Sequence, residues 1–181
     1  MPAGGCKPPA MPEPMTDLDT VKRLAEERAE RYAGFRAFIK GRLDWGDARL
    51  DRVVHEIARP IHEAVDCTSC ANCCCTMLVR VHPGDAPRLA RHLRLQEADF
   101  EARYLAVNRQ GEKMIAGSPP CPFLCGLRCS AYTVRPRDCR EFPHLLKAGF
   151  RSRSLSVFAN AGECPIVFNT LERLMLAVGF R

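Results

Sequence analysis

Cysteine is the residue type in this chain that is best suited to chemistry, and its distribution is uneven. The chain has 181 residues and 11 cysteines, and all but one of the cysteines fall between Cys67 and Cys164. This local density is typical of disulfide or metal-binding scaffolds. The first residues contain no apolar stretch of the secretory kind, so we expect a reducing, cytoplasmic location. In such a compartment, clustered thiols indicate metal binding or redox chemistry rather than structural disulfides.

The first group of cysteines has the spacing of a metal-binding loop. It reads Cys67-Thr-Ser-Cys70-Ala-Asn-Cys73-Cys74-Cys75. Short spacers allow the sulfurs to converge on one centre, and both zinc and iron–sulfur sites use them. The small residues between the cysteines also permit a tight loop. This group therefore predicts coordination of a metal by thiolates.

The second group runs from Cys121 to Cys139, with the sequence CPFLCGLRCSAYTVRPRDC, and Cys164 follows downstream. Pro136 and Pro165 each suit the first turn of a helix. We therefore expect Cys139 near one helix N-terminus and Cys164 at the cap of another, where the positive helix end favours a thiolate. Several arginines would either offset an anionic cluster or form a solvated basic face: Arg80, Arg128, Arg135, Arg137 and Arg140.

The combined pattern of C-x2-C-x2-CC, CPFL, C-x2-Y-x2-RP-x2-CR-x-FP and a later CP resembles the YkgJ-like cysteine-cluster family. Members of that family are described as zinc- or iron-chelating or iron–sulfur-cluster proteins. The resemblance covers about residues 67–164. It implies that eight cysteines bind metal: Cys67, Cys70, Cys73, Cys74, Cys121, Cys129, Cys139 and Cys164.

The resemblance also carries over three residues that we expect beside the metal, as hydrogen-bond donors or anion contacts: Tyr132, Arg135 and Arg140. For Tyr132, a role in packing is the stronger alternative. Four further side chains are candidate additional ligands: Cys75, Cys125, His82 and His144. The two cysteines lie outside the family pattern, and the two histidines flank the clusters. An isolated thiol, Cys6, is expected to be incidental.

The elements that must position these residues are mostly helical, and we expect an α+β fold with short strands. Residues 1–16 contain five prolines and predict a disordered leader. Residues 17–66 predict a helical arm of two helices, with a kink or restart at Pro60. Residues 67–181 predict a cysteine-cluster metal-binding domain that ends in a helix over 165–180. Within it, we expect strands over 77–81 and 111–117 and helices over 85–95 and 97–108.

Our leading interpretation is a cysteine-cluster metalloprotein that binds an iron–sulfur cluster or iron in a redox or oxidoreductase-type role. Enzymatic activity stays open, and an iron–sulfur oxidoreductase or a protein-modifying enzyme both fit the pattern. The resemblance extends to longer flagellin lysine N-methylases, but this chain has no Gly-rich strand–turn–helix for S-adenosylmethionine. The alternative is a structural zinc module for protein interaction.

The charge and hydropathy of the chain restrict its partners. The formal net charge is +6, and two four-thiolate metal sites would bring it to roughly +2. Nucleic-acid binding is the least favoured class, because the aromatic residues that would contact bases, Phe123, Tyr132 and Phe142, lie within the family motifs and in expected core positions. The chain has no apolar run long enough to span a membrane. We expect a redox or protein partner instead.

Overall fold

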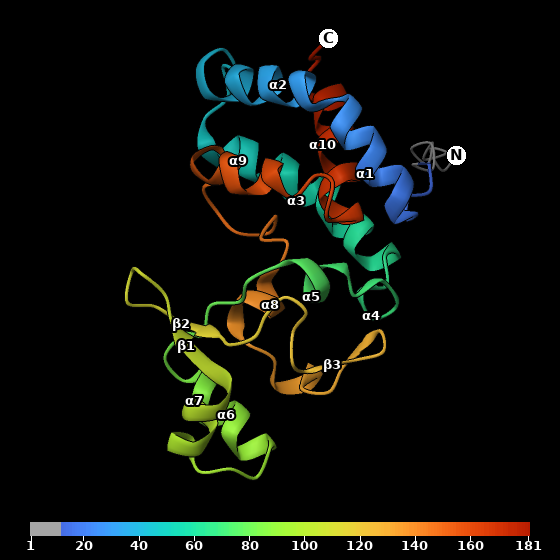
Figure 1. The fold of residues 1–181 in the computed structure, drawn as a ribbon. Helices are drawn as coiled ribbons and strands as arrows, with labels where there is room; N and C mark the ends of the chain where they lie inside the picture. Colours follow the sequence, from blue (N-terminus) through green and yellow to red (C-terminus); the bar gives the residue numbers. More distant parts are fainter. Residues whose placement is uncertain (1–11) are drawn as a thin grey trace, which may run out of the picture.

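The computed structural model describes residues 12–181, and these form two bodies joined by the cysteine-rich segments (Figure 1). The predictions for residues 1–11, Cys6 included, lie outside the described residues. The larger body, at the top of Figure 1, contains five helices: α1 (Leu18–Glu27), α2 (Ala29–Gly41), α3 (Asp47–Ala64), α9 (Phe150–Ala159) and α10 (Pro165–Ala177).

The N-terminal helices follow the predicted arm with two differences. The Asp17 carboxylate caps α1 by accepting a hydrogen bond from the Thr20 N–H at 2.9 Å. A break at Arg28 divides the predicted first helix into α1 and α2. In α3 the helix continues through Pro60, so the predicted restart does not occur. Before α1, the Met15 backbone exchanges two hydrogen bonds with the Asn169 side chain of α10.

The core of the larger body forms where α10 packs along α3. Leu50 and Ile61 of α3 are fully buried together with Leu171 and Leu174 of α10 and Phe35 of α2. Each such side chain contributes about 1.5–3 kcal/mol when it is fully buried. The larger body therefore has an apolar core that does not depend on the cysteines, apart from Cys164.

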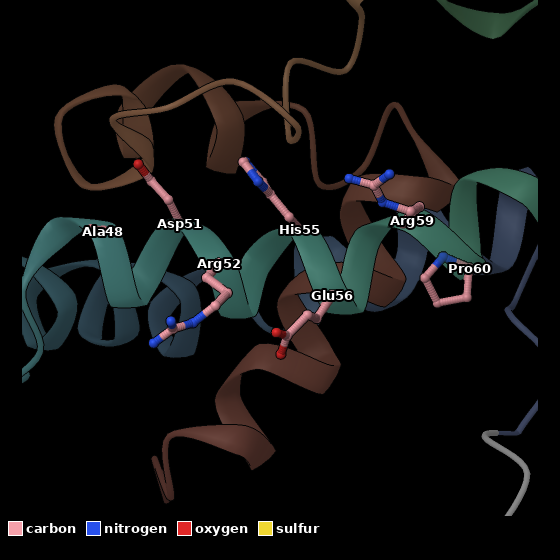
Figure 2. Close-up of a pocket in the computed structure, with 7 residues that line it drawn as sticks. All are labelled: Ala48, Asp51, Arg52, His55, Glu56, Arg59 and Pro60. Atoms are coloured by element: carbon pink, nitrogen blue, oxygen red, sulfur yellow. The ribbon is translucent and has the colours of Figure 1, made fainter.

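Helix α9 starts at a cap that comes from a distant part of the chain. The Asp51 carboxylate of α3 accepts hydrogen bonds from the N–H groups of Gly149 at 2.7 Å and Phe150 at 2.8 Å. Figure 2 shows Asp51 on the same side of α3 as His55 and Arg59, while Glu56 points to the opposite side. These side chains line a hollow along α3 that contains no cysteine.

The smaller body, at the bottom of Figure 1, combines short helices with a two-stranded sheet. It contains α6 (Asp85–His92), α7 (Glu97–Tyr104), β1 (Leu105–Val107), β2 (Lys113–Ile115) and the 3₁₀ helix η1 (Tyr132–Val134). Strands β1 and β2 are antiparallel, with Leu105 opposite Ile115. Its separate core includes Leu89 and a group of three aromatic rings, Phe100, Tyr104 and Phe123.

The predicted elements of this region are partly confirmed. The strand around Met114 is present as β2, and the C-terminal helix is present as α10. The predicted helix over 97–108 ends at Tyr104, because residues 105–107 instead pair with β2. The predicted strand over 77–81 is reduced to an isolated bridge between Arg80 and Met114. The mostly helical α+β class is confirmed.

A thin layer lies between the two bodies and carries the cysteine clusters. It contains α4 (Cys67–Cys70), α5 (Asn72–Thr76), the β3–β4 hairpin (Leu124–Cys125 with Arg128–Cys129) and α8 (Arg137–Glu141). Figure 1 shows α4, α5, α8 and β3 in the middle of the molecule. Among residues 12–181, none of the helices is long and apolar enough to cross a membrane.

Candidate metal centre

A cavity of about 580 Å³ lies in this layer, and cysteines form part of its wall. Six of the eight predicted ligands line it: Cys67, Cys73, Cys74, Cys121, Cys129 and Cys139. The rest of the wall is largely apolar and includes Val79, Ile115 and Phe123. All ten cysteines of the described chain are free thiols. The structure thus brings together two cysteine groups that are far apart in the sequence.

The first cysteine group is arranged by two short helices with a sharp turn between them. Asp66 starts α4 by accepting hydrogen bonds from the Thr68 N–H at 2.8 Å and the Thr68 hydroxyl at 2.7 Å. Ala71, with φ of 51°, ends α4 in the left-handed region and starts α5. Cys67 and Cys70 are three residues apart and therefore share one face of α4. Cys73 and Cys74 are consecutive in α5, so they project about 100° apart.

Cys164 lies beside the first group, although it is distant in the sequence. The Asn72 side-chain amide donates hydrogen bonds to the Glu163 carbonyl at 2.8 Å and to the Glu163 carboxylate at 3.0 Å. This contact places the residue before Cys73 against the residue before Cys164. Cys164 is only 6% exposed and is the N-cap of α10, as the sequence predicts. Negative charge on Cys67 or Cys70 raises the pKa of the Cys164 thiol.

The second cysteine group is attached to α5 through the backbone. The Cys121 N–H donates to the Cys74 carbonyl at 2.8 Å. The β3–β4 hairpin then returns the chain, and Ser130 binds the Phe123 carbonyl through both its N–H and its hydroxyl. Cys129, which ends the hairpin, therefore lies close to Cys121. Both cysteines pack against the core of the smaller body.

Cys139 is positioned by the buried carboxylate of Asp85, the first residue of α6. Asp85 is 2% exposed and accepts hydrogen bonds from the Arg88 guanidinium at 2.6 Å and the Arg137 N–H at 3.2 Å. Arg88 also donates to the carbonyls of Val134 and Arg135. Asp85 and Arg88 together fix the start of α8, and the Asp138 carboxylate of α8 binds the His82 ring at 2.6 Å.

Burial controls the ionisation of most of the thiols. It raises the pKa of Cys139 to about 12 and, despite hydrogen bonds from two backbone N–H groups, that of Cys164 to about 12. Burial also raises the pKa of Cys67, Cys121 and Cys129. The helix end at Cys164 favours the thiolate, as predicted, but desolvation outweighs it. Such thiols remain protonated unless a cation compensates the thiolate charge.

Cys73 and Cys74 form the exception, because they interact directly with each other. A hydrogen bond between the two side chains lowers the pKa of Cys74 and raises the pKa of Cys73. The Cys73 thiol donates to the Cys74 sulfur, which is then the preferred site of negative charge. Of the two thiols, Cys74 is therefore the one that loses its proton more readily.

Arg135 supplies positive charge next to the thiols. Its guanidinium lies 3.9 Å from the centroid of the Tyr132 ring and donates to the Tyr132 carbonyl at 2.7 Å. Its charge acts to lower the pKa of both Cys67 and Cys129. Tyr132 is 43% exposed and, like Arg135 and Arg140, lines the cavity. The three residues that the resemblance places beside the metal therefore lie at the cavity.

The remaining arginines have other contacts. Arg80 pairs with Glu112, and Arg137 pairs with Glu141 at 2.8 Å. The positive charge of Arg128 helps to lower the pKa of the Asp66 carboxyl group. These three arginines lie within the cysteine region, but the cavity lining does not include them.

The four candidate additional ligands differ in position. Cys75 and Cys125 are exposed, and neither belongs to the cavity lining. The two ring nitrogens of His82 contact Asp138 and Arg80, so this ring already has partners. His144 lines the cavity, and its Nδ1 atom is buried without a hydrogen-bond partner within residues 12–181. His144 is thus the best placed of the four.

The thiols are gathered but not yet assembled around one point. In the part of the chain that the structure describes, no three His, Cys, Asp or Glu side chains form a group that could hold a metal ion as they stand. Metal binding at this layer therefore requires the thiols to draw closer together.

The fold and the cavity define a mostly helical α+β protein with a cysteine-cluster site. A family model called CxxCxxCC, described as a "putative zinc- or iron-chelating domain", matches residues 66–165. This match covers more than half of the 181 residues, and the chain belongs to this family. The match agrees with the resemblance to the YkgJ-like cysteine-cluster family. Comparisons with curated proteins and with solved structures give no match.

Proposed function

We propose that this protein binds iron, as an iron–sulfur cluster or as iron ions, and uses it to transfer electrons. The observation that carries the proposal is the gathering of two distant cysteine groups and Cys164 in one layer, around a cavity with largely apolar walls. The proposed ligands are the eight cysteines that the family pattern contains. The family description, zinc- or iron-chelating, supports metal binding but does not specify which of the two metals is bound.

The donor set and the cavity fit such a group. Thiolates are soft ligands that select zinc, copper(I) and iron–sulfur clusters. The cavity that six of these cysteines line, about 580 Å³ in volume, leaves room for a metal centre beside them. The raised pKa values of the buried thiols mean that a metal must displace their protons. Binding is therefore expected to release protons and to weaken as the pH falls.

When bound, an iron centre would supply one-electron chemistry, and the residues of this chain would control it. Burial and apolar neighbours such as Ile115 and Phe123 would exclude water and lower the local dielectric. Arg135, held against Tyr132, would offset part of the negative charge of the thiolates. We also propose a reducing, cytoplasmic location and a redox partner, because clustered cysteines stay unpaired more readily where thiols are kept reduced.

The proposal is tested on the full chain purified without air. We expect a coloured protein whose visible absorption bleaches when dithionite is added and returns on reoxidation. A colourless protein with stoichiometric zinc and no reversible absorption change would contradict the proposal and would favour the structural zinc module. The variant Cys75→Ser is the matched control, because Cys75 is exposed and lies outside the cavity lining. It should retain the full absorption change.

A further inference from the structure

The predicted ligands divide between the two bodies of the molecule. Cys164 is buried in the core of the larger body. Cys121, Cys129 and Cys139 pack against the core of the smaller body. The chain therefore presents thiols to the layer from both sides, and the two sides differ in sequence, in burial and in the elements that hold them.

The first cysteine group contributes to both sides. Asn72, which precedes Cys73, is hydrogen bonded to Glu163, which precedes Cys164. The Cys74 carbonyl instead accepts from the Cys121 N–H at 2.8 Å. Consecutive residues of a helix project about 100° apart, so Cys73 and Cys74 suit different neighbours. The adjacent pair thus marks the boundary between the two sides.

Of the other three cysteines in the first group, Cys75 is exposed, whereas Cys67 and Cys70 belong with Cys164. Cys67 and Cys70 occupy one face of α4, and only Ala71 separates α4 from α5, so they share one short segment with Cys73. In the smaller body, Cys121, Cys129 and Cys139 pack against one core, and the Cys121 N–H donates to the Cys74 carbonyl. Helix α4 also contacts β4, which ends at Cys129, as expected for two sets that share a border.

We propose that the layer holds two adjacent metal centres, each bound by four thiolates. The first set is Cys67, Cys70, Cys73 and Cys164, and the second set is Cys74, Cys121, Cys129 and Cys139. The proposal rests on the proposed function in that the thiols must bind metal, but it does not depend on which metal is bound. Cys73 and Cys74 have Cα atoms about 3.8 Å apart, so they hold the two centres next to each other.

The test compares double variants within one set and across the two sets, using the full chain and metal analysis per chain. Cys70→Ser alone should remove about half of the metal, because one centre loses a ligand and the other is intact. The within-set pair Cys67→Ser/Cys70→Ser should also retain about half. The cross-set pair Cys70→Ser/Cys129→Ser should retain almost none. These residues are chosen because each is at least partly exposed, whereas Cys164 is buried. Cys125→Ser, at an exposed thiol outside both sets, is the control and should keep the full content.

A second measurement uses the unaltered protein and so does not depend on the folding of variants. A limiting amount of chelator is added, the exposed thiols are alkylated, and the modified cysteines are identified by peptide mass spectrometry. We expect protection to be lost in two groups of four that correspond to the two sets. Cys75 and Cys125 should react before chelator is added.

The outcomes separate this proposal from the proposed function. Equal metal loss from the within-set and cross-set pairs, or loss of protection by all eight thiols together, would overturn the two-centre arrangement even if the metal is iron. If the bound metal is zinc, and its content falls by about half in the within-set pair and almost to zero in the cross-set pair, the result would support the arrangement and contradict the iron proposal. A wild-type chain that binds neither metal would overturn both.

Discussion

At the scale of single residues, Asp85 holds the start of α8, the helix that carries Cys139. Its carboxylate is 2% exposed and joins the start of α6 to the start of α8 through Arg88 and the Arg137 N–H. In the sequence, Asp85 follows Pro83 and Gly84, which are typical turn residues, and so suits the start of a helix. Its contact with α8, 52 residues away, depends on tertiary packing that has no local sequence signal.

Asp85→Ala should lower the free energy of unfolding by about 2 kcal/mol, since hydrogen bonds to a charged group are lost and Arg88 is left without its carboxylate. The measurement is a urea unfolding curve, with the midpoint compared at constant slope. Asp44→Ala, at an exposed carboxylate, is the control and should change the stability by less than about 0.5 kcal/mol. An equally small effect of Asp85→Ala would show that the carboxylate does not hold α8.

Because of Tyr32, the stability of the larger body should depend on pH in alkaline solution. Burial, the hydrogen bond to Glu172 at 2.7 Å and the negative charge of Glu172 all raise the Tyr32 pKa. The unfolded chain releases this proton near pH 10, and the folded chain retains it. The unfolded state then binds fewer protons, so the stability falls as the pH rises above about 10.

We expect Tyr32→Phe to reduce this fall. Unfolding curves in reducing buffer between pH 8 and 11 should show a steeper loss of stability for the wild type than for Tyr32→Phe, by up to about 1.4 kcal/mol per pH unit. At pH 8 the variant should be less stable by about 1 kcal/mol, because the hydrogen bond to Glu172 is lost. Parallel pH profiles for the two proteins would rule out the raised pKa.

At the scale of elements, α9 is a helix that was not predicted from the sequence. Its segment, FRSRSLSVFA, has no clear apolar stripe, and its starting cap comes from Asp51 of α3, almost 100 residues earlier. By contrast, α10 has a proline in its first turn and a long apolar stripe, so its range was predicted closely. A helix can be predicted from its local sequence only when the residues that cap it and the residues that it buries are both found in that sequence.

Asp51→Ala should destabilise the protein by about 1 kcal/mol, the usual cost of removing a helix cap. Both N–H groups that Asp51 serves would lose their acceptor. Hydrogen exchange should show faster exchange at the start of α9, while α7, in the smaller body, should be unchanged. Uniform changes in both bodies would contradict a local capping role.

At the scale of the whole molecule, two separate cores meet at a cysteine layer. The family pattern in the sequence identified all six cysteines that line the cavity, as well as Tyr132, Arg135 and Arg140. It did not reveal which thiols are neighbours, because Cys164 joins the first group through an Asn72–Glu163 contact that spans 91 residues. Spacing within a motif constrains nearby ligands, whereas the packing of two bodies decides how distant ligands combine.

Removal of metal should therefore affect the layer and the smaller body more than the larger body. The larger body keeps an extensive apolar core of its own, but the smaller body has few elements and packs its core against three of the predicted ligands. After chelation, hydrogen exchange should accelerate in α4, α5 and α8, with little change in α3 and α10. Equal acceleration in α3 and α10 would show that the metal supports the whole fold.

The most direct test of the central claim is the iron and acid-labile sulfide content of the full chain, made with iron and zinc both available and purified without air. We predict that iron is the bound metal and that it is lost from the cross-set variant Cys70→Ser/Cys129→Ser but not from Cys75→Ser. A chain that carries stoichiometric zinc and no iron, or that retains its iron in the cross-set variant, would contradict the account.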